Sequence, residues 1–217
     1  MSCAAMCSPQ PPISCRKRDA VKIDAQTLDY AAAYKLLSGV VVPRPIAWVS
    51  TISPAGQSNL APFSCFTYVS ADPPMIGFNC GRRGGALKDT AANIHATGQF
   101  VVNIVDETLL EPMHQSSADF PADVDEIDLL GIPSEPSECV APRRIASSPI
   151  SLECVLERVI SFGRAGAEFI VGEIKLFHIR DDLIKDGKVD TADLRPLARL
   201  AGPVYARLGD IIRITDG

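Results

Sequence analysis

The chain has 217 residues, of which 47% are hydrophobic and 22% charged, with a formal net charge of −5. This length and composition predict one domain with a sizeable core, residues 25–217, behind an N-terminal tail, residues 1–24. The acidic balance and the scattered lysines and arginines argue against a nucleic-acid partner. No apolar run approaches the roughly 20 residues that cross a bilayer, and residues 1–15 lack the apolar segment of a secretory signal. We therefore expect a cytoplasmic protein without membrane association.

Seven cysteines are present, and no two of them form a Cys-x-x-Cys pair, so the strongest zinc and redox patterns are absent. Three cysteines lie in the tail, which is rich in serine and proline and is predicted to have no fixed fold. The tail gives only weak support for a metal site. The apolar surroundings of Cys65, Cys80 and Cys154 predict that these three thiols are buried in the core.

Hydrophobic periodicity divides the first half of the domain into helices and short strands. In chain order the expected elements are a helix at 24–37, strands at 40–52, 57–70 and 75–80, a helix at 88–97 and a strand at 99–105. Gly39 and Gly98 follow the two helices, which is where helix-ending glycines stand.

The second half begins with a polar, proline-rich segment, residues 106–149, which carries an acidic run at 123–128. The EF-hand spacing and its glycine are absent, so we predict a mobile, solvated cover rather than a metal site. Strands are expected at 151–160, 168–179 and 205–214, the first two as a hairpin. Without βαβ alternation, this order predicts a mainly β fold, a closed or nearly closed antiparallel barrel with peripheral helices.

The segment before the second helix contains the elements of an anion site. It lacks the contiguous Gly-Lys-Ser/Thr of a triphosphate-binding loop, because Lys88 is followed by Asp89. If the helix begins near Asp89, its free N–H groups and positive dipole end lie beside the Lys88 ammonium and the Thr90 hydroxyl, which suits one phosphate. The same residues are equally consistent with Asp89 as a helix cap and Lys88 as a solvated charge.

Polar residues also stand on the two strands before that segment. Ser50 and Thr51 end an apolar strand, which predicts two hydroxyls at a barrel rim, although threonine is also an ordinary strand former. Asn59 and Ser64 bracket a stretch in which Pro62 removes a ladder donor. This strand is therefore expected to bulge or to lie at an edge, with some backbone groups free for a ligand; an ordinary edge strand explains the same residues.

No pattern of a nucleophile with its base is present. The three histidines stand apart in the sequence, and neither a Gly-x-Ser-x-Gly elbow nor a His-Glu-x-x-His pair occurs. A phosphate site, a polar rim and no catalytic pair together indicate that a cofactor carries the reactivity. We therefore assign no catalytic side chain and no metal ligand.

Several short blocks form an ordered series: RPIAWVST (44–51), NLAPFS (59–64), DPP (72–74), KDT (88–90), GQFVVN (98–103) and LAR (197–199). In this order the blocks resemble the flavin reductase-like family of FMN-binding split barrels, and its flavoredoxin-like branch most of all. The resemblance covers about residues 28–214. One departure is Ala201-Gly202-Pro203, where a Gly-Gly pair is expected.

The resemblance implies an antiparallel split barrel of Greek-key type and a homodimer with FMN in a groove near the subunit interface. It implies an oxidoreductase that takes hydride from NADH or NADPH and passes electrons to an acceptor or a partner monooxygenase. By matching position, the implied FMN-binding residues are Ser50, Thr51, Lys88 and Thr90 at the phosphate, Asn59, Ala61, Phe63 and Ser64 along the ribityl chain and ring, and Asn79 and Gly81 on the other side. Asp89 is a further implied FMN-binding residue.

Two other classes of function stay open. An FMN-binding electron-transfer or flavin-storage protein with little NAD(P)H turnover fits as well, because no Gly-x-Gly-x-x-Gly dinucleotide loop is present. A split-barrel module for pyridoxal phosphate, haem or no ligand is the other alternative.

Overall fold

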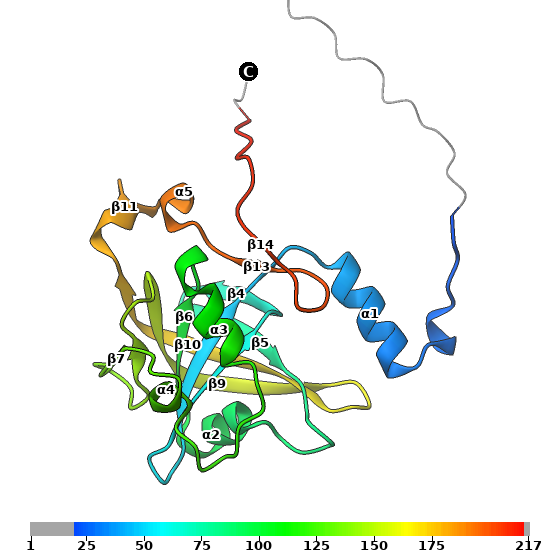
Figure 1. The fold of residues 1–217 in the computed structure, drawn as a ribbon, viewed down its shortest axis with the longest axis horizontal. Coiled ribbons are helices and arrows are strands. Elements are labelled where there is room, and N and C mark those ends of the chain that lie inside the picture. Colours follow the sequence, from blue (N-terminus) through cyan, green and yellow to red (C-terminus); the bar gives the residue numbers. More distant parts are fainter. Residues whose placement is uncertain (1–19, 215–217) are drawn as a thin grey trace, which may run out of the picture.

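The computed structural model describes residues 20–214 of the chain, so the cysteines of the tail lie outside the described residues. The centre of the fold is one antiparallel sheet of seven strands in the order β3-β2-β6-β9-β10-β5-β4 (Figure 1). The bounds are β2 (Ala47–Ile52), β3 (Ser58–Phe63), β4 (Phe66–Ala71), β5 (Pro74–Cys80), β6 (Gln99–Ile104), β9 (Ile150–Phe162) and β10 (Ala167–Ile179).

The two edges of this sheet are neighbours in the chain. Only Ser64 and Cys65 separate β3 from β4, so the sheet must roll until its edges meet at that end. The backbone N–H of Asn79 donates to the carbonyl of Cys65 at 2.9 Å, which ties the link to β5. The result is a barrel split between β3 and β4, which confirms the predicted mainly β fold with peripheral helices.

The sheet buries side chains on both faces. Along β2, Ala47 and Val49 point into the barrel interior, while Trp48 points outward into a second apolar cluster. The Trp48 indole N–H donates to Ser116 Oγ at 2.8 Å. Alternation with period two on a strand buried on both faces explains why residues 46–49 are all apolar.

The segment 106–149 supplies the outer cluster and is not the solvated cover that its composition predicted. It contains η2 (Glu107–Leu109), α3 (Leu110–Gln115), α4 (Glu126–Leu129), β7 (Ser134–Glu135) and β8 (Arg144–Ile145). Met113 and Ile127 are fully buried against Trp48. The few apolar residues of this polar segment fix it to the barrel as a packed layer.

Smaller elements surround the barrel. They are η1 (Ala25–Thr27), α1 (Tyr30–Val40), β1 (Arg44–Pro45), α2 (Asp89–Thr97), η3 (Asp181–Leu183), β11 (Ile184–Lys185), β12 (Lys188–Val189), α5 (Thr191–Leu194), β13 (Ala198–Arg199) and β14 (Tyr205–Ala206). Strands β1, β13 and β14 form a separate small sheet. No helix within residues 20–214 is long and apolar enough to span a membrane.

Several predicted elements need correction. Helix α1 continues through Gly39, and the strand expected at 40–52 is interrupted before β2. The strand expected at 57–70 is two strands, because the chain crosses from one sheet edge to the other. The strand expected at 205–214 is only the short β14, since residues beyond it pair with no described strand. Cys80 and Cys154 are buried as predicted, but Cys65 is exposed because it lies in the link.

The second helix and the hairpin are confirmed. Helix α2 ends at Gly98, which has the left-handed φ of 69° that favours glycine. Strands β9 and β10 pair antiparallel from the Ala167–Phe162 partners at the turn to the Ile179–Ile150 partners at the far end. The two strands of this long hairpin are neighbours in the middle of the seven-stranded sheet.

Gly172 makes room for an aromatic ring in the barrel interior. A Cβ at this position would overlap the fully buried ring of Phe100. We expect Gly172→Ala to destabilise the protein by about 1–3 kcal/mol through overpacking, measured by urea unfolding. Gly39→Ala is the control. Gly39 lies in helix α1, and a Cβ added there meets nothing within 4 Å, so this variant should not be destabilised. Equal stability of Gly172→Ala and the parent would contradict the prediction.

Candidate functional site

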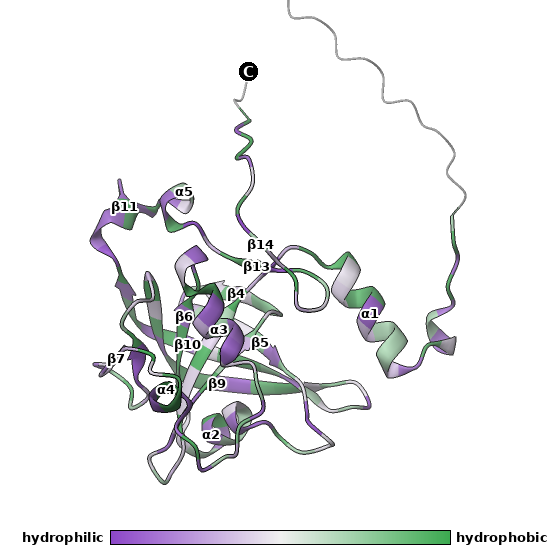
Figure 2. Cartoon of the chain, viewed as in Figure 1, coloured by the Kyte–Doolittle hydropathy of each residue, from purple (hydrophilic) through white to green (hydrophobic). Residues whose placement is uncertain are grey.

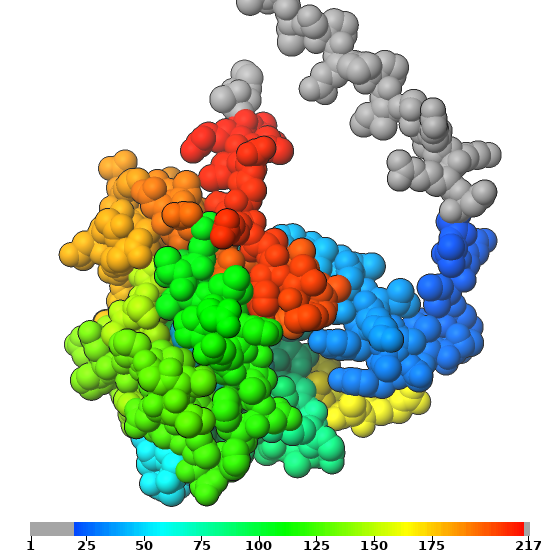
Figure 3. Space-filling view, viewed as in Figure 1, coloured from blue at the N-terminus to red at the C-terminus, as the bar shows by residue number. Residues whose placement is uncertain are grey.

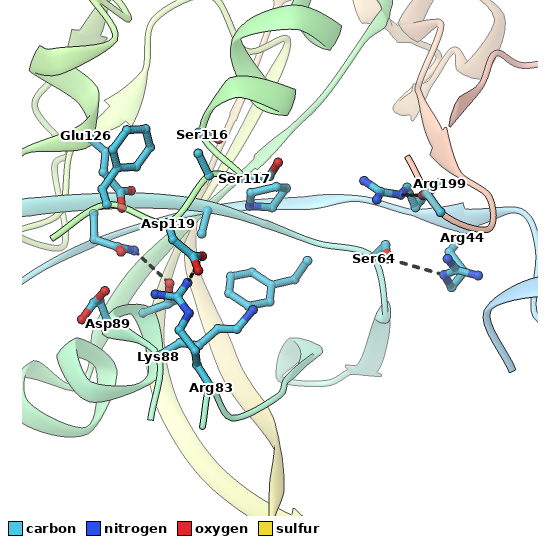
Figure 4. Close-up of a pocket in the computed structure, with 18 of the residues that line it drawn as sticks. Arg44, Ser64, Arg83, Lys88, Asp89, Ser116, Ser117, Asp119, Glu126 and Arg199 are labelled. Atoms are coloured by element: carbon cyan, nitrogen blue, oxygen red, sulfur yellow. Dashed lines mark hydrogen bonds and ion pairs between the residues drawn. The ribbon is translucent and has the colours of Figure 1, made fainter. Parts of the chain in front are cut away.

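A cavity of about 260 Å³ lies between β3, the start of α2 and the loop that follows α3 (Figure 4). Four cationic side chains, Arg44, Arg83, Lys88 and Arg199, and three acidic ones, Asp89, Asp119 and Glu126, line it. The fold thus brings together charged groups from distant parts of the chain around one concave surface.

Seven of the eleven residues predicted to bind FMN line this cavity. They are Asn59, Ala61, Phe63, Ser64, Lys88, Asp89 and Thr90. Strand β3 supplies the first three, and its position at the sheet edge, as the Pro62 argument predicted, leaves it facing the cavity. The other four, Ser50, Thr51, Asn79 and Gly81, are not among the lining residues.

Helix α2 presents its first turn to the cavity. It begins at Asp89, with Lys88 in the N-cap position and no side chain capping the free N–H groups. Asp89 is therefore not the helix cap. The Lys88 ammonium lies 5.8 Å from the centroid of the Phe63 ring, and it makes no ion pair with any described residue. A cation and free backbone donors thus meet at one end of the cavity.

A buried amide network fixes the polar side chains at this end. Asn59 Nδ2 donates to Thr90 Oγ1 at 2.8 Å and is 3.4 Å from Thr51 Oγ1, while Asn93 Nδ2 donates to the same Thr51 oxygen at 3.1 Å. Thr51 is fully buried, so it orients Asn59 and Asn93 instead of standing at a rim. The predicted rim position of Thr51 is therefore wrong, and its contact with the phosphate stays a prediction.

Ser50 also lies away from the cavity. It is fully buried, and its hydroxyl donates to the Arg143 carbonyl at 2.5 Å. The predicted rim position differs because segment 106–149 packs over the outward face of β2. Asn79 lies on β5, and its backbone N–H donates to the carbonyl of Cys65 between β3 and β4. Gly81 directly follows β5, and neither residue lines the cavity.

Arg83 lines the cavity but was not predicted. It stands on a turn in which Gly84 and Gly85 have φ of 56° and 84°, closed by reciprocal bonds of 2.9 Å between Arg83 and Ala86. Positive φ at both central positions is typical of a tight hairpin turn and favours glycine. Arg83 pairs with Asp119 of the loop after α3 at 2.5 Å. The Arg-Gly-Gly sequence shortly before Lys88 is the signal that could have indicated this residue.

Glu126 forms another unpredicted part of the cavity wall. Only 7% of its surface is exposed, and Oε2 accepts the N–H of Leu60 at 2.5 Å. Burial raises the pKa of Glu126 to about 7, although the Leu60 N–H favours the charged form. Asp125 likewise accepts the N–H of Ser58 at 3.2 Å. The two acids therefore satisfy outward N–H groups of the edge strand β3, which the prediction left free for a ligand.

Two acids of the acidic run, Asp125 and Asp128, pair with one arginine. Arg143 binds Asp125 at 2.8 Å and Asp128 at 2.8 Å. Within residues 20–214, no group of three or more His, Cys, Asp or Glu residues is arranged to hold a metal ion. Asp125 and Glu126 bond this segment to β3, and Asp125 and Asp128 tie it to Arg143, the residue before β8.

The three histidines contact protein groups outside the cavity. His95 Nε2 is 2.9 Å from Glu168, His178 Nε2 is 2.6 Å from Glu153, and His114 Nδ1 is 3.0 Å from the Tyr205 hydroxyl. None of them lines the cavity. The polar lining instead consists of cations, hydroxyls, amides and carboxyls, of which the cations, hydroxyls and amide N–H groups can bind an anionic ligand.

Comparison with known proteins identifies the family. A protein-family model described as the flavin reductase like domain matches residues 38–197. An uncharacterized protein of Halalkalibacterium halodurans is 42% identical over 195 residues, covering 88% of this chain and 93% of that protein.

Two solved structures extend the comparison. The nitrilotriacetate monooxygenase component B from Bacillus cereus matches with a TM-score of 0.88 and 33% identity, covering 91% of this chain and 100% of that one. The 2-nitrobenzoate 2-nitroreductase of Pseudomonas fluorescens matches with a TM-score of 0.81 and 36% identity, covering 91% and 96%. The chain therefore belongs to the flavin reductase-like family that its ordered sequence blocks resemble.

Proposed function

We propose that this protein is an FMN-dependent oxidoreductase that uses NADH or NADPH as electron donor. The observation that supports this most directly is the meeting of Lys88, Thr90 and the uncapped start of α2 in one cavity with Asn59 and Phe63. The family assignment points to a flavin, and both solved relatives carry the names of redox proteins.

The start of α2 fits the phosphate of FMN. Lys88 has no carboxylate partner among the described residues, and a helix N-terminus favours negative charge through its dipole and its free N–H groups. The Thr90 hydroxyl is held by Asn59, and Arg83, which pairs with Asp119, stands on the adjoining loop. These residues would bind the phosphate.

The rest of β3 fits the ribityl chain and the ring. Ala61, Pro62 and Phe63 present a small, mostly apolar strip along the cavity, and Ser64 follows at its end. Bound there, FMN would supply the capacity to accept hydride and to release electrons to an acceptor or a partner monooxygenase. The chain's own residues would hold the cofactor and orient the second substrate.

The test is direct. The purified protein should show the absorption of oxidised flavin or take up added FMN, denaturation should release a ligand with the mass of FMN, and the same preparation should oxidise NADH or NADPH. A colourless protein that fails to bind added FMN would overturn the proposal. Bound FMN without NADH or NADPH oxidation would instead support the electron-transfer or flavin-storage alternative.

We further propose that a second copy of the chain completes the groove. Helix α1 projects from the body of the molecule and contains no buried residue (Figures 2 and 3). Tyr30, Leu37 and Val40 on this helix are 71%, 61% and 72% exposed. The cavity is also small beside typical ligand sites of roughly 300–1,000 Å³, as expected of a groove with one wall missing. Exposed apolar surface of this kind marks an interaction site.

This assembly gives a prediction. The protein should run as a dimer in light scattering at micromolar concentration, and Leu37→Glu should shift it toward monomer, because a charge would be buried in an apolar contact. Lys35→Glu, a charge change at an exposed position of the same helix, is the matched control. A parent protein that is monomeric with flavin bound would refute the proposed assembly.

A further inference from the structure

Two arginines form a cationic end of the cavity that the flavin phosphate does not use. Arg44 and Arg199 lie on the opposite side of the cavity from Lys88, Arg83 and Asp89 (Figure 4). Asn59 bonds Thr90 at the start of α2, and Ser64, which directly follows β3, lies 3.4 Å from Arg44 Nε. From Asn59 to Phe63 the chain is extended, and at about 3.3 Å per residue this stretch of β3 separates the start of α2 from Arg44 by roughly 13 Å. One phosphate cannot contact both ends.

These arginines differ from the others of the described chain. Four described arginines are at least partly buried, and two of them, Arg143 and Arg144, pair with carboxylates. Arg44 and Arg199 form no ion pair with any residue from 20 to 214. Charge removed from water without a counter-charge is costly, so the pair is suited to an external anion.

Arg44 contributes charge from a fixed position. Its guanidinium donates to the carbonyls of Ser38 at 2.7 Å, Val41 at 2.5 Å and Leu200 at 2.8 Å. Its Nε lies 3.4 Å from the hydroxyl of Ser64. These neutral partners occupy its donors but leave its positive charge unbalanced.

Two of the three guanidinium nitrogens of Arg199 donate hydrogen bonds to described residues. Nε donates to the Gly202 carbonyl at 2.7 Å, Nη1 donates to the Tyr205 hydroxyl at 2.6 Å, and the guanidinium lies 4.7 Å from the centroid of the Tyr205 ring. His114 in turn contacts that hydroxyl at 3.0 Å. Nη2 has no acceptor among the described residues, so a planar, preorganised guanidinium keeps one amino group for an oxyanion.

We infer that Arg199, with the charge of Arg44 behind it, binds the carboxylate or phosphate of the second substrate and selects anionic substrates over neutral ones. The inference rests on the proposed function, because it takes the opposite end of the cavity as the site of the flavin phosphate. The shared chemistry is an oxyanion at the Arg199 end of the cavity, supplied by an aromatic carboxylate or by the pyrophosphate of a nicotinamide dinucleotide.

The experiment is calorimetric titration of the parent, with and without FMN, using two matched pairs of probes. The pairs are benzoate with neutral benzamide, and NAD⁺ with nicotinamide. The parent should bind at least one anionic probe more tightly than its neutral counterpart. Arg199→Gln should weaken that probe by about ten- to a hundredfold and leave the neutral one unchanged, as expected for a lost charge-assisted hydrogen bond. Arg199→Lys should retain part of the preference.

The pattern of losses identifies the source of the anion. If Arg199→Gln loses affinity for benzoate alone, the site binds a substrate carboxylate. If it loses affinity for NAD⁺ alone, the site binds the dinucleotide pyrophosphate. Arg195→Gln is the control, since Arg195 is exposed and pairs with Glu107 outside the cavity. No preference for either anion in the parent, or an unchanged preference in Arg199→Gln, would overturn the inference. Failure of the parent to bind FMN would count against the proposed function instead, because the titrations without FMN still report on Arg199.

Discussion

Lys88→Ala is expected to weaken FMN binding about ten- to a hundredfold, which corresponds to the roughly 1.5–3 kcal/mol of a charge-assisted hydrogen bond. The lysine stands at the start of α2 with no ion-pair partner among the described residues, and its ammonium faces the cavity beside Phe63. Its loss removes the cation closest to the free N–H groups of the helix. Fluorescence titration of FMN measures the effect.

Riboflavin separates a phosphate contact from a general effect. It lacks the phosphate, so parent and Lys88→Ala should bind it almost equally. Lys188→Ala, an exposed lysine on β12 outside the cavity, should leave FMN affinity unchanged. The stability of the apo protein should change little in either variant, since neither side chain is in the core. Unchanged FMN affinity in Lys88→Ala, or an equal loss for riboflavin, would show that Lys88 is a solvated surface charge.

Local signals in the sequence predicted the parts of the site that one segment builds. The Gly98 stop and the periodicity before it located α2, and therefore Lys88, Asp89 and Thr90 at its start. Pro62 located an edge strand, because proline cannot donate to a ladder. Both inferences depend only on neighbouring residues, which is why they needed no knowledge of the fold.

The residues that were missed depend on contacts between distant segments. Arg44 donates to a carbonyl 156 residues away, and Trp48 binds a serine 68 residues away. Nothing in the local sequence around Arg199 indicates that it shares a cavity with Lys88. Ser50 was misplaced for the same reason: a strand of alternating side chains does not reveal whether another layer covers its outer face. Thr51 points to the opposite side of β2, where the side chains of Asn59 and Asn93 contact it.

Segment 106–149 shows how composition can mislead. Its helices have only four and six residues, too few for the helical period to be visible. Met113, Ile127, Ile132 and Ile145 are spread among polar residues, yet all four pack into one cluster with Trp48. Three acids of this segment, Asp125, Glu126 and Asp128, bond to β3 or pair with Arg143, so part of its polar character serves contacts within the protein.

Glu126 should make the stability of the protein fall as the pH rises from about 4.5 to 7. The pKa of its carboxyl is raised from 4.5 to about 7, mainly by burial. Between these values the folded state holds a proton that the unfolded state has released, so raising the pH favours unfolding. The stabilisation is fully present below the lower pKa and is lost as the pH passes the upper one. Its size is on the order of 1–3 kcal/mol.

Glu126→Gln tests this prediction because its carboxamide keeps an acceptor for the Leu60 N–H and cannot ionise. The variant should match the parent near pH 4.5 and exceed it in stability at pH 8, measured by urea unfolding at constant ionic strength. Asp125→Asn provides a contrast of opposite sign. The pKa of Asp125 is lowered, since the N–H donors of Asp128 and Ser58 and the charge of Arg143 outweigh its burial. The stabilisation by ionised Asp125 is therefore lost as the pH falls, and Asp125→Asn should be less stable than the parent at pH 8.

The same substitution connects stability to the proposed phosphate site. Ionised Glu126 places a negative charge in the cavity that also contains Lys88 and Asp89. The ratio of FMN affinities, Glu126→Gln over parent, should therefore rise as the pH passes about 7, while the titration of the phosphate itself cancels from the ratio. A ratio that stays constant from pH 5 to 8, together with parallel stability profiles, would mean that the Glu126 carboxyl does not titrate in this range.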